Sequence, residues 1–145
     1  MIHLALKRLL FAAGLLLLAG CGDKASSSGT IPVTGLVTYQ GKPVAEANVV
    51  FQSPERGSFA MTDAEGCFEL QTFETGDGAL PGEYKVMISK LHIVAPEFDM
   101  GDPRYVPPPP PKHLIPAKYA DANSSGLTAK VEAGKANEFT FELTD

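Results

Sequence analysis

The stretch EYKVMISK, residues 83–90, decides the fold class of this 145-residue chain. Its apolar residues Tyr84, Val86 and Ile88 recur at every second position and are separated by side chains that are mostly more polar. Successive side chains of a β-strand point to opposite faces of a sheet. A period of two therefore predicts a strand with one buried face over these residues.

The same alternation recurs in six other short segments, which are separated by turns rich in Gly, Pro, Asp and Asn. No helical period of useful length accompanies them. Because every strand has an apolar face that must leave water, two sheets have to pack together, which predicts an all-β, seven-stranded β-sandwich. The further segments are Val33–Gln40, Ala47–Gln52, Ser58–Thr62, Cys67–Thr72, Leu127–Val131 and Glu138–Leu143.

The alternation also predicts which side chains form the core, although in Ser58–Thr62 either face could point inward. Two connections have a clear sequence signal. The Asp63-Ala64-Glu65-Gly66 segment predicts a tight turn, and the loop Glu132–Asn137 predicts a hairpin between the last two strands. The predicted core residues are Val37, Val49, Phe51, Phe68, Leu70, Tyr84, Val86, Ile88, Val131, Phe139 and Phe141.

The first 20 residues differ in composition from the rest of the chain. Lys7 and Arg8 precede the uninterrupted apolar run Leu9–Leu18, which ends at the small residues Ala19 and Gly20. A basic start, a short apolar run and small residues at its end are typical of a secretory signal peptide. The run is shorter than the roughly 20 residues that span a bilayer, so we predict a signal peptide over residues 1–20.

The stretch Leu18-Ala19-Gly20-Cys21 resembles the lipobox of bacterial lipoproteins. The resemblance implies diacylglycerol transfer to the Cys21 sulfur, cleavage before Cys21 and a lipid that holds the protein on the membrane. Residues 21–32 would then form a flexible tether, because GDKASSSGT is small and polar. Gly22 follows the cysteine where an aspartate would favour the inner membrane, so the periplasmic face of the outer membrane is favoured. The alternative is an ordinary signal peptide with an incidental cysteine.

Several segments of the predicted domain, residues 33–145, resemble carboxypeptidase regulatory-like domains. The resemblance implies a transthyretin-like (prealbumin-like) sandwich with an Ig-like arrangement of seven strands, and it implies no catalytic residues. The segment Ile115–Asp121 is followed closely by Ser125–Thr128, and this succession of two segments resembles that in small lipoproteins of planctomycete-type bacteria. The segments that carry the first resemblance are Val33–Tyr39, Gly41–Val44, Ala47–Phe51, Thr62–Leu70 and Pro81–Val86.

Charge and residue types exclude several function classes. Lys7 and Arg8 belong to the leader, so the rest of the chain carries 10 of the 12 Lys and Arg against all 17 Asp and Glu, a net charge of −7. An acidic domain disfavours nucleic acid and electrostatic docking on anionic lipid. No nucleophile–base set or chelating loop is present in the sequence, so we expect no catalytic residues, no metal and no cofactor. Cys67 is expected to be a reduced and partly buried strand residue, with pairing between chains as the alternative.

The segment 91–126 is predicted to be a long irregular loop, and it contains the five prolines Pro107–Pro111. Such a run adopts an extended polyproline conformation and serves either as a docking strip or as a stiff spacer. Long loops are often functional, so this loop supplies the candidate contact residues. These candidates for ligand or partner contact are Phe98, Tyr105, Tyr119, His92 and His113.

These observations predict a non-enzymatic, membrane-anchored lipoprotein of the cell envelope with a structural, adhesive or protein-interaction role. Its partner would be an envelope protein or a glycan. The alternative is a module that binds a carbohydrate or a small molecule on the envelope. The chain has no tryptophan, which disfavours the aromatic platforms that bind sugars.

Overall fold

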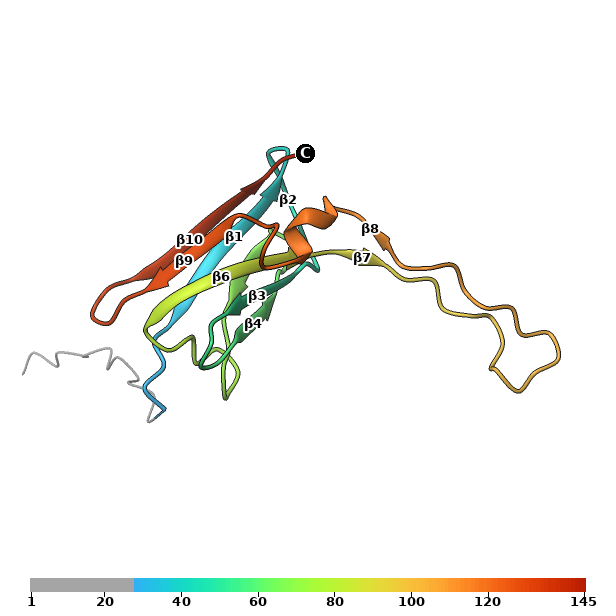
Figure 1. Cartoon of the computed structure of the whole chain (residues 1–145), viewed down its shortest axis with the longest axis horizontal. Coiled ribbons are helices and arrows are strands. Elements are labelled where there is room, and N and C mark those ends of the chain that lie inside the picture. The colour runs from blue at the N-terminus through green and yellow to red at the C-terminus, as the bar shows by residue number, and fades with distance from the viewer. Residues whose placement is uncertain (1–27) are drawn as a thin grey trace, which may run out of the picture.

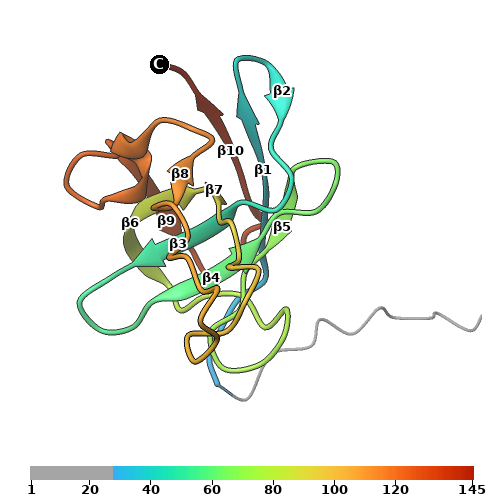
Figure 2. The same cartoon turned by 90° about the vertical axis from the view of Figure 1, so that its right-hand side faces the viewer.

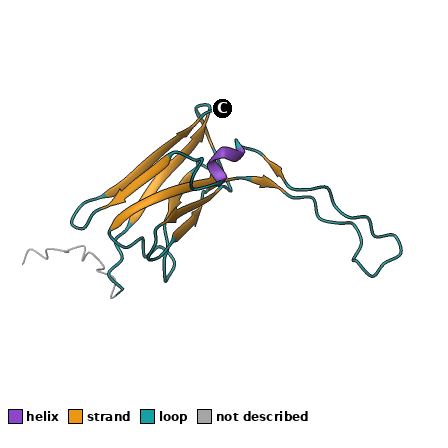
Figure 3. Ribbon diagram, viewed as in Figure 1, coloured by secondary structure: helices purple, strands orange, loops and turns teal. Residues whose placement is uncertain are grey.

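Ten β-strands and one short 3₁₀ helix follow one another in the computed structural model, which describes residues 28–145 (Figures 1 and 3). The predicted signal peptide and Cys21 lie outside the described residues. The strands are β1 (Val33–Tyr39), β2 (Lys42–Pro43), β3 (Asn48–Gln52), β4 (Ser58–Met61), β5 (Cys67–Glu69), β6 (Gly82–Ser89), β7 (Leu91–His92), β8 (Lys112–His113), β9 (Leu127–Val131) and β10 (Asn137–Leu143), and the helix η1 covers Ala117–Ala120.

The first sheet is built around β1. The last strand, β10, runs parallel to β1 over its whole length, from Val33 opposite Asn137 to Tyr39 opposite Leu143. On the other side of β1, β5 pairs antiparallel with its first half and β2 pairs with its end. The first and last strands of the domain therefore lie side by side, and β1 is the central strand of this sheet.

The second sheet has the order β4-β3-β6-β9, and all its neighbouring strands are antiparallel. Figure 2 shows how its strands cross those of the first sheet when the molecule is viewed from the side of the long projecting loop. One core lies between the sheets, with Val37 and Phe141 from the first and Val49, Phe51 and Val86 from the second. The protein is thus all-β and consistent with a β-sandwich, as the sequence predicts.

Phe51 lies at the centre of the core and is completely buried. Its ring centroid is 5.7 Å from those of Tyr84 and Phe139, 6.1 Å from Phe141 and 6.3 Å from Phe68. All four pairs are tilted or edge-to-face, and the edge-to-face arrangement is one that aromatic rings prefer. Phe51 therefore joins the two sheets through aromatic packing. The predicted core is confirmed except at Phe139, which is only half-buried.

The structure settles which face of β4 points inward. Ser58 and Ala60 are buried, whereas Phe59 and Met61 are 51% and 62% exposed. A buried serine needs a hydrogen-bond partner, and the Ser58 hydroxyl lies 2.7 Å from the hydroxyl oxygen of Thr72. This partner allows the smaller, polar residue to take the inward position.

The predicted turn over Asp63–Gly66 is confirmed. The Asp63 carboxylate accepts hydrogen bonds from the backbone N–H groups of Glu65 and Cys67. Gly66 has a φ of 79°, which a residue with a Cβ atom adopts only with strain. A second glycine, Gly35, is required for space, because a Cβ atom there would overlap the Phe139 carbonyl oxygen and the Phe68 ring.

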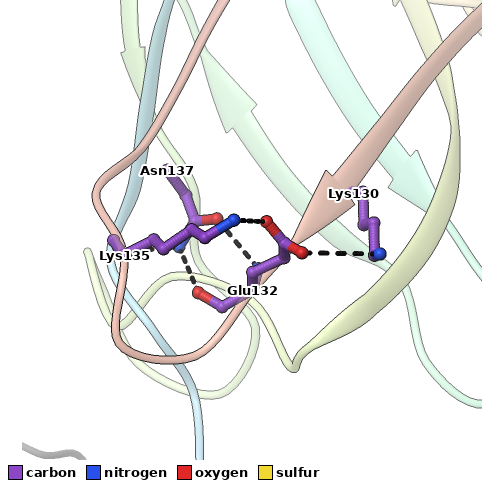
Figure 4. A network of polar contacts seen from close by, with 4 residues as sticks. All are labelled: Lys130, Glu132, Lys135 and Asn137. Carbon is purple, nitrogen blue, oxygen red and sulfur yellow. Dashed lines mark hydrogen bonds and ion pairs between the residues drawn. The ribbon is translucent and has the colours of Figure 1, made fainter.

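The predicted hairpin between the last two strands is wrong. β9 pairs with β6 in the second sheet, and β10 pairs with β1 in the first, so their connection crosses from one sheet to the other. The Asn137 side chain holds this loop by accepting from the Glu132 N–H at 2.9 Å and donating to the Glu132 and Lys135 carbonyls (Figure 4). These side-chain bonds replace the backbone ladder of a hairpin.

Two further expectations need correction. Three two-residue strands, β2, β7 and β8, add to the seven that the alternation predicts, because a two-residue strand is too short to show a period. The segment 91–126 is also not uniformly irregular. Its first part forms β7 and β8, and its last part packs on the sandwich, where Ile115 and Ser125 are buried.

Replacing Phe51 with alanine should destabilise the domain severely. The substitution opens a cavity between four aromatic rings, which costs about 3–5 kcal/mol and lowers Tm by at least about 10 °C. Thermal unfolding followed by circular dichroism measures this loss. Phe59→Ala is the matched control, because Phe59 is half exposed, and it should cost at most about 1 kcal/mol. Equal losses for the two variants would contradict the central role of Phe51.

Candidate functional site

A long arm, residues 90–114, projects from the sandwich beyond the end of β6 (Figures 1 and 2). Its base is held by β7 and β8, in which Leu91 lies opposite His113 and His92 opposite Lys112. The Leu114 N–H also donates to the Lys90 carbonyl at 2.9 Å. These bonds make the arm a direct extension of the second sheet rather than a loop folded over its surface.

The arm exposes apolar side chains instead of burying them. Met100 is 83% exposed, Val106 72% and Ile93 68%, and Val94 also faces solvent. Soluble domains rarely present so many apolar residues on one element unless it makes contact with another molecule. The arm is therefore the strongest candidate for an interaction site.

The tip of the arm, residues 97–105, has a defined conformation. The Arg104 guanidinium donates to both carboxylate oxygens of Asp102, at 3.0 and 2.8 Å. The same guanidinium lies over the Phe98 ring, 3.9 Å from its centroid, in a cation–π contact. The Tyr105 N–H then donates to the Asp102 carbonyl and closes the turn. The sequence did not predict the contact between Asp102 and Arg104. An acidic and a basic residue two positions apart do not indicate an ion pair unless the turn that brings them together is known.

The five prolines Pro107–Pro111 lie in the limb that returns from the tip, and all are exposed. Because proline has no backbone N–H, this limb cannot donate to a β-ladder. Any partner must therefore recognise it through side-chain packing and through its carbonyl oxygens.

The structure places four of the five candidate contact residues on the arm. His92 and His113 lie in β7 and β8 and are exposed, but they do not lie directly opposite each other. Strand alternation and this register put their side chains on opposite faces of the two-stranded ladder. Phe98 and Tyr105 belong to the tip and are half-buried.

Tyr119, the fifth candidate, lies in η1 and is buried. Its hydroxyl donates to the Thr144 carbonyl and accepts from the Thr144 N–H, both at 3.0 Å. The accepted backbone hydrogen bond lowers the pKa of the hydroxyl. Tyr119 therefore fastens the end of the chain to the segment that follows the arm, and its ring is not presented to a partner.

A shallow groove of about 1080 Å³ lies over the outer face of the second sheet. Gln52, Lys85 and Thr128 lie side by side across β3, β6 and β9 and form part of its floor. At the rim, the Lys85 ammonium donates to the Asn123 side-chain oxygen at 3.2 Å. The sequence could not reveal this groove, because its residues become neighbours only when three strands pair.

Other chemistry is sparse in the described part of the chain. Cys67 lies in β5 with a free thiol and is exposed rather than partly buried, because it is Phe68 that points into the core. Within residues 28–145 no three His, Cys, Asp or Glu residues gather as a metal site would need, and no helix is long and apolar enough to cross a membrane. The buried polar side chains of these residues are hydrogen-bonded, as Thr62 is to the Val44 carbonyl and the Ala47 N–H.

The ion pair at the tip should lower the pKa of Asp102. The Arg104 side chain holds the pKa of this carboxyl below its ordinary value of 3.8. The carboxylate therefore stabilises the tip above that value, and this contribution is lost as the pH falls through the lowered pKa. An NMR titration of the Asp102 carboxyl carbon should show a midpoint below 3.8, and Arg104→Ala should raise it. Identical midpoints in the two proteins would contradict the pairing.

The comparisons with known proteins leave the family open. No family model matches the chain, and no curated protein matches it. Among solved structures, it is similar to a 9R-lipoxygenase from Cyanothece PCC8801, with a TM-score of 0.38 and 14% identity over 81% of this chain. The chain spans 17% of the length of the lipoxygenase. A likeness this low supports no statement about fold type or activity.

Proposed function

We propose that this protein is a non-enzymatic lipoprotein of the bacterial cell envelope that is anchored by lipid on Cys21 and binds its partner through the arm. The observation that carries the proposal is the arm itself. It extends away from the sandwich with Ile93, Met100 and Val106 exposed, so its apolar surface is available for contact.

The conformation of the tip supports a contact role over that of a stiff spacer. A spacer needs only length, which the prolines supply. The Arg104 contacts with Asp102 and Phe98 additionally fix the tip before any partner is bound. An element that is ordered in advance loses less conformational entropy on binding.

The position of the arm also suits a protein anchored at its N-terminal end. The described chain begins, in blue, at the end of the molecule away from the arm (Figure 1). A lipid on Cys21 would therefore hold one end of the molecule at the membrane, on the periplasmic face of the outer membrane. The arm, at the opposite end of the molecule, would remain clear of the anchor and available to a partner.

The anchor is tested by replacing Cys21 with alanine in the full-length chain. The thiol is the only group of that side chain that can accept the lipid, so Cys21→Ala should move the protein from the membrane fraction to the soluble fraction. Mass spectrometry of the wild-type protein should show the added acyl chains. Cys67→Ser is the matched control and should leave the protein in the membrane. Retention of Cys21→Ala in membranes would refute the anchor.

The contact role is tested at Met100, the exposed apolar residue of the tip. With benzoylphenylalanine in place of Met100, irradiation of intact cells should link the arm covalently to another polypeptide. The same probe in place of Thr75, which is exposed outside the arm, is the control and should give no such adduct. Absence of any adduct from a folded, membrane-bound protein would refute the contact role.

The groove over β3, β6 and β9 favours a second candidate, the binding of a carbohydrate or small molecule. Its floor offers the Gln52 amide, the Lys85 ammonium and the Thr128 hydroxyl, which can bind a polar ligand. A glycan or metabolite that raises Tm in the wild type but not in Lys85→Ala would support this candidate over the arm.

A further inference from the structure

We infer that the partner of the arm is the arm of a second copy of this chain, with the two arms antiparallel and the tip of each lying on the base of the other. The inference rests on the proposal that the arm is the contact element. It adds the identity of the partner and the geometry of the contact.

The charges of the arm are separated along its length. Lys90 and Lys112 lie at the base. Lys90 immediately precedes β7, and Lys112 lies opposite His92 in the pairing of β7 with β8. Glu97 and Asp99 lie at the tip. Among the described residues, none of these four charged side chains takes part in an ion pair. The arm therefore has a positive base and a negative tip whose charges the chain itself does not neutralise.

This separation selects one arrangement of two copies. Two parallel arms would place tip against tip and base against base, so like charges would meet. Antiparallel arms place each acidic tip on a basic base, and a two-fold axis makes the two contacts identical. Each arm therefore provides both the acidic tip and the basic base that the contact requires.

Three of the exposed apolar residues of the arm lie between its charged ends. Ile93 and Val94 on the outgoing limb and Val106 on the returning limb are exposed. Antiparallel pairing would bring these middle segments of the two arms together and remove the apolar side chains from water. Because Pro107–Pro111 have no N–H groups, this part of the contact would rest on side-chain packing rather than on a shared β-ladder.

The test uses the full-length chain in intact cells, with benzoylphenylalanine in place of Met100. Irradiation should produce an adduct with twice the mass of the chain. Mass spectrometry should place the crosslink between position 100 of one copy and the base of the other, near Lys90 or Lys112. Crosslinks that join tip to tip would overturn the antiparallel arrangement.

Two charge-reversed variants then test the complementarity. The tip variant carries Glu97→Lys with Asp99→Lys, and the base variant carries Lys90→Glu with Lys112→Glu. Each variant alone should lose adduct by about tenfold or more, because the symmetry repeats every repulsive contact. The tip variant has a positive tip and a positive base, and the base variant has a negative tip and a negative base. When the two are expressed together, every contact between them is attractive, so a mixed adduct should form with the wild-type yield.

A matched control reverses two acids outside the arm, Glu55→Lys with Glu74→Lys, and should keep the adduct. All variants should retain the wild-type Tm, because the arm contributes no residue from 91 to 114 to the core. An adduct insensitive to both reversals, or one that is not restored by mixing, would overturn the inference. An adduct with a different protein would overturn self-pairing but support the contact role, whereas no adduct at all would refute both.

Discussion

The parallel pairing of β1 with β10 is the constraint on which the rest of the structure depends. It makes β1 the central strand of the first sheet, so that β5 and β2 find an edge to pair with. It also places Phe141 and Leu143 in the core, where Phe141 packs against Phe51 of the opposite sheet. The residues that follow β10 are secured nearby, because the Gln40 N–H donates to the Leu143 carbonyl and the Tyr119 hydroxyl donates to the Thr144 carbonyl. The arm can extend freely because the core is complete without it.

Local patterns predict the strands well and their partners poorly. The alternation of Tyr84, Val86 and Ile88 is sufficient to identify a buried face, since side-chain direction follows from the backbone alone. It fails for β4, where the inward position of Ser58 depends on a hydrogen bond to Thr72 that lies in another segment. The loop Glu132–Asn137 is misleading in another way, because its short length predicts a hairpin whereas its two strands pair in different sheets.

The candidate site was predictable as a region but not as a set of contacts. The proline run and the length of the loop point to residues 91–126, and His92, Phe98, Tyr105 and His113 do lie on the arm. Tyr119 has a structural role instead, since its partner Thr144 lies 25 residues further along the chain. The pairing of Leu91 with His113 has no sequence signal, because two residues on each side are too few to show a period.

The pairing of β1 with β10 also affects the order in which the sheets form during folding. In the first sheet, β1 lacks its longest partner strand until β10 is available, and pairs so distant in sequence form slowly. Until then β1 has an unpaired edge of the kind that promotes aggregation. The first sheet therefore becomes complete only when β10, the most distant of its strands in the sequence, has paired with β1.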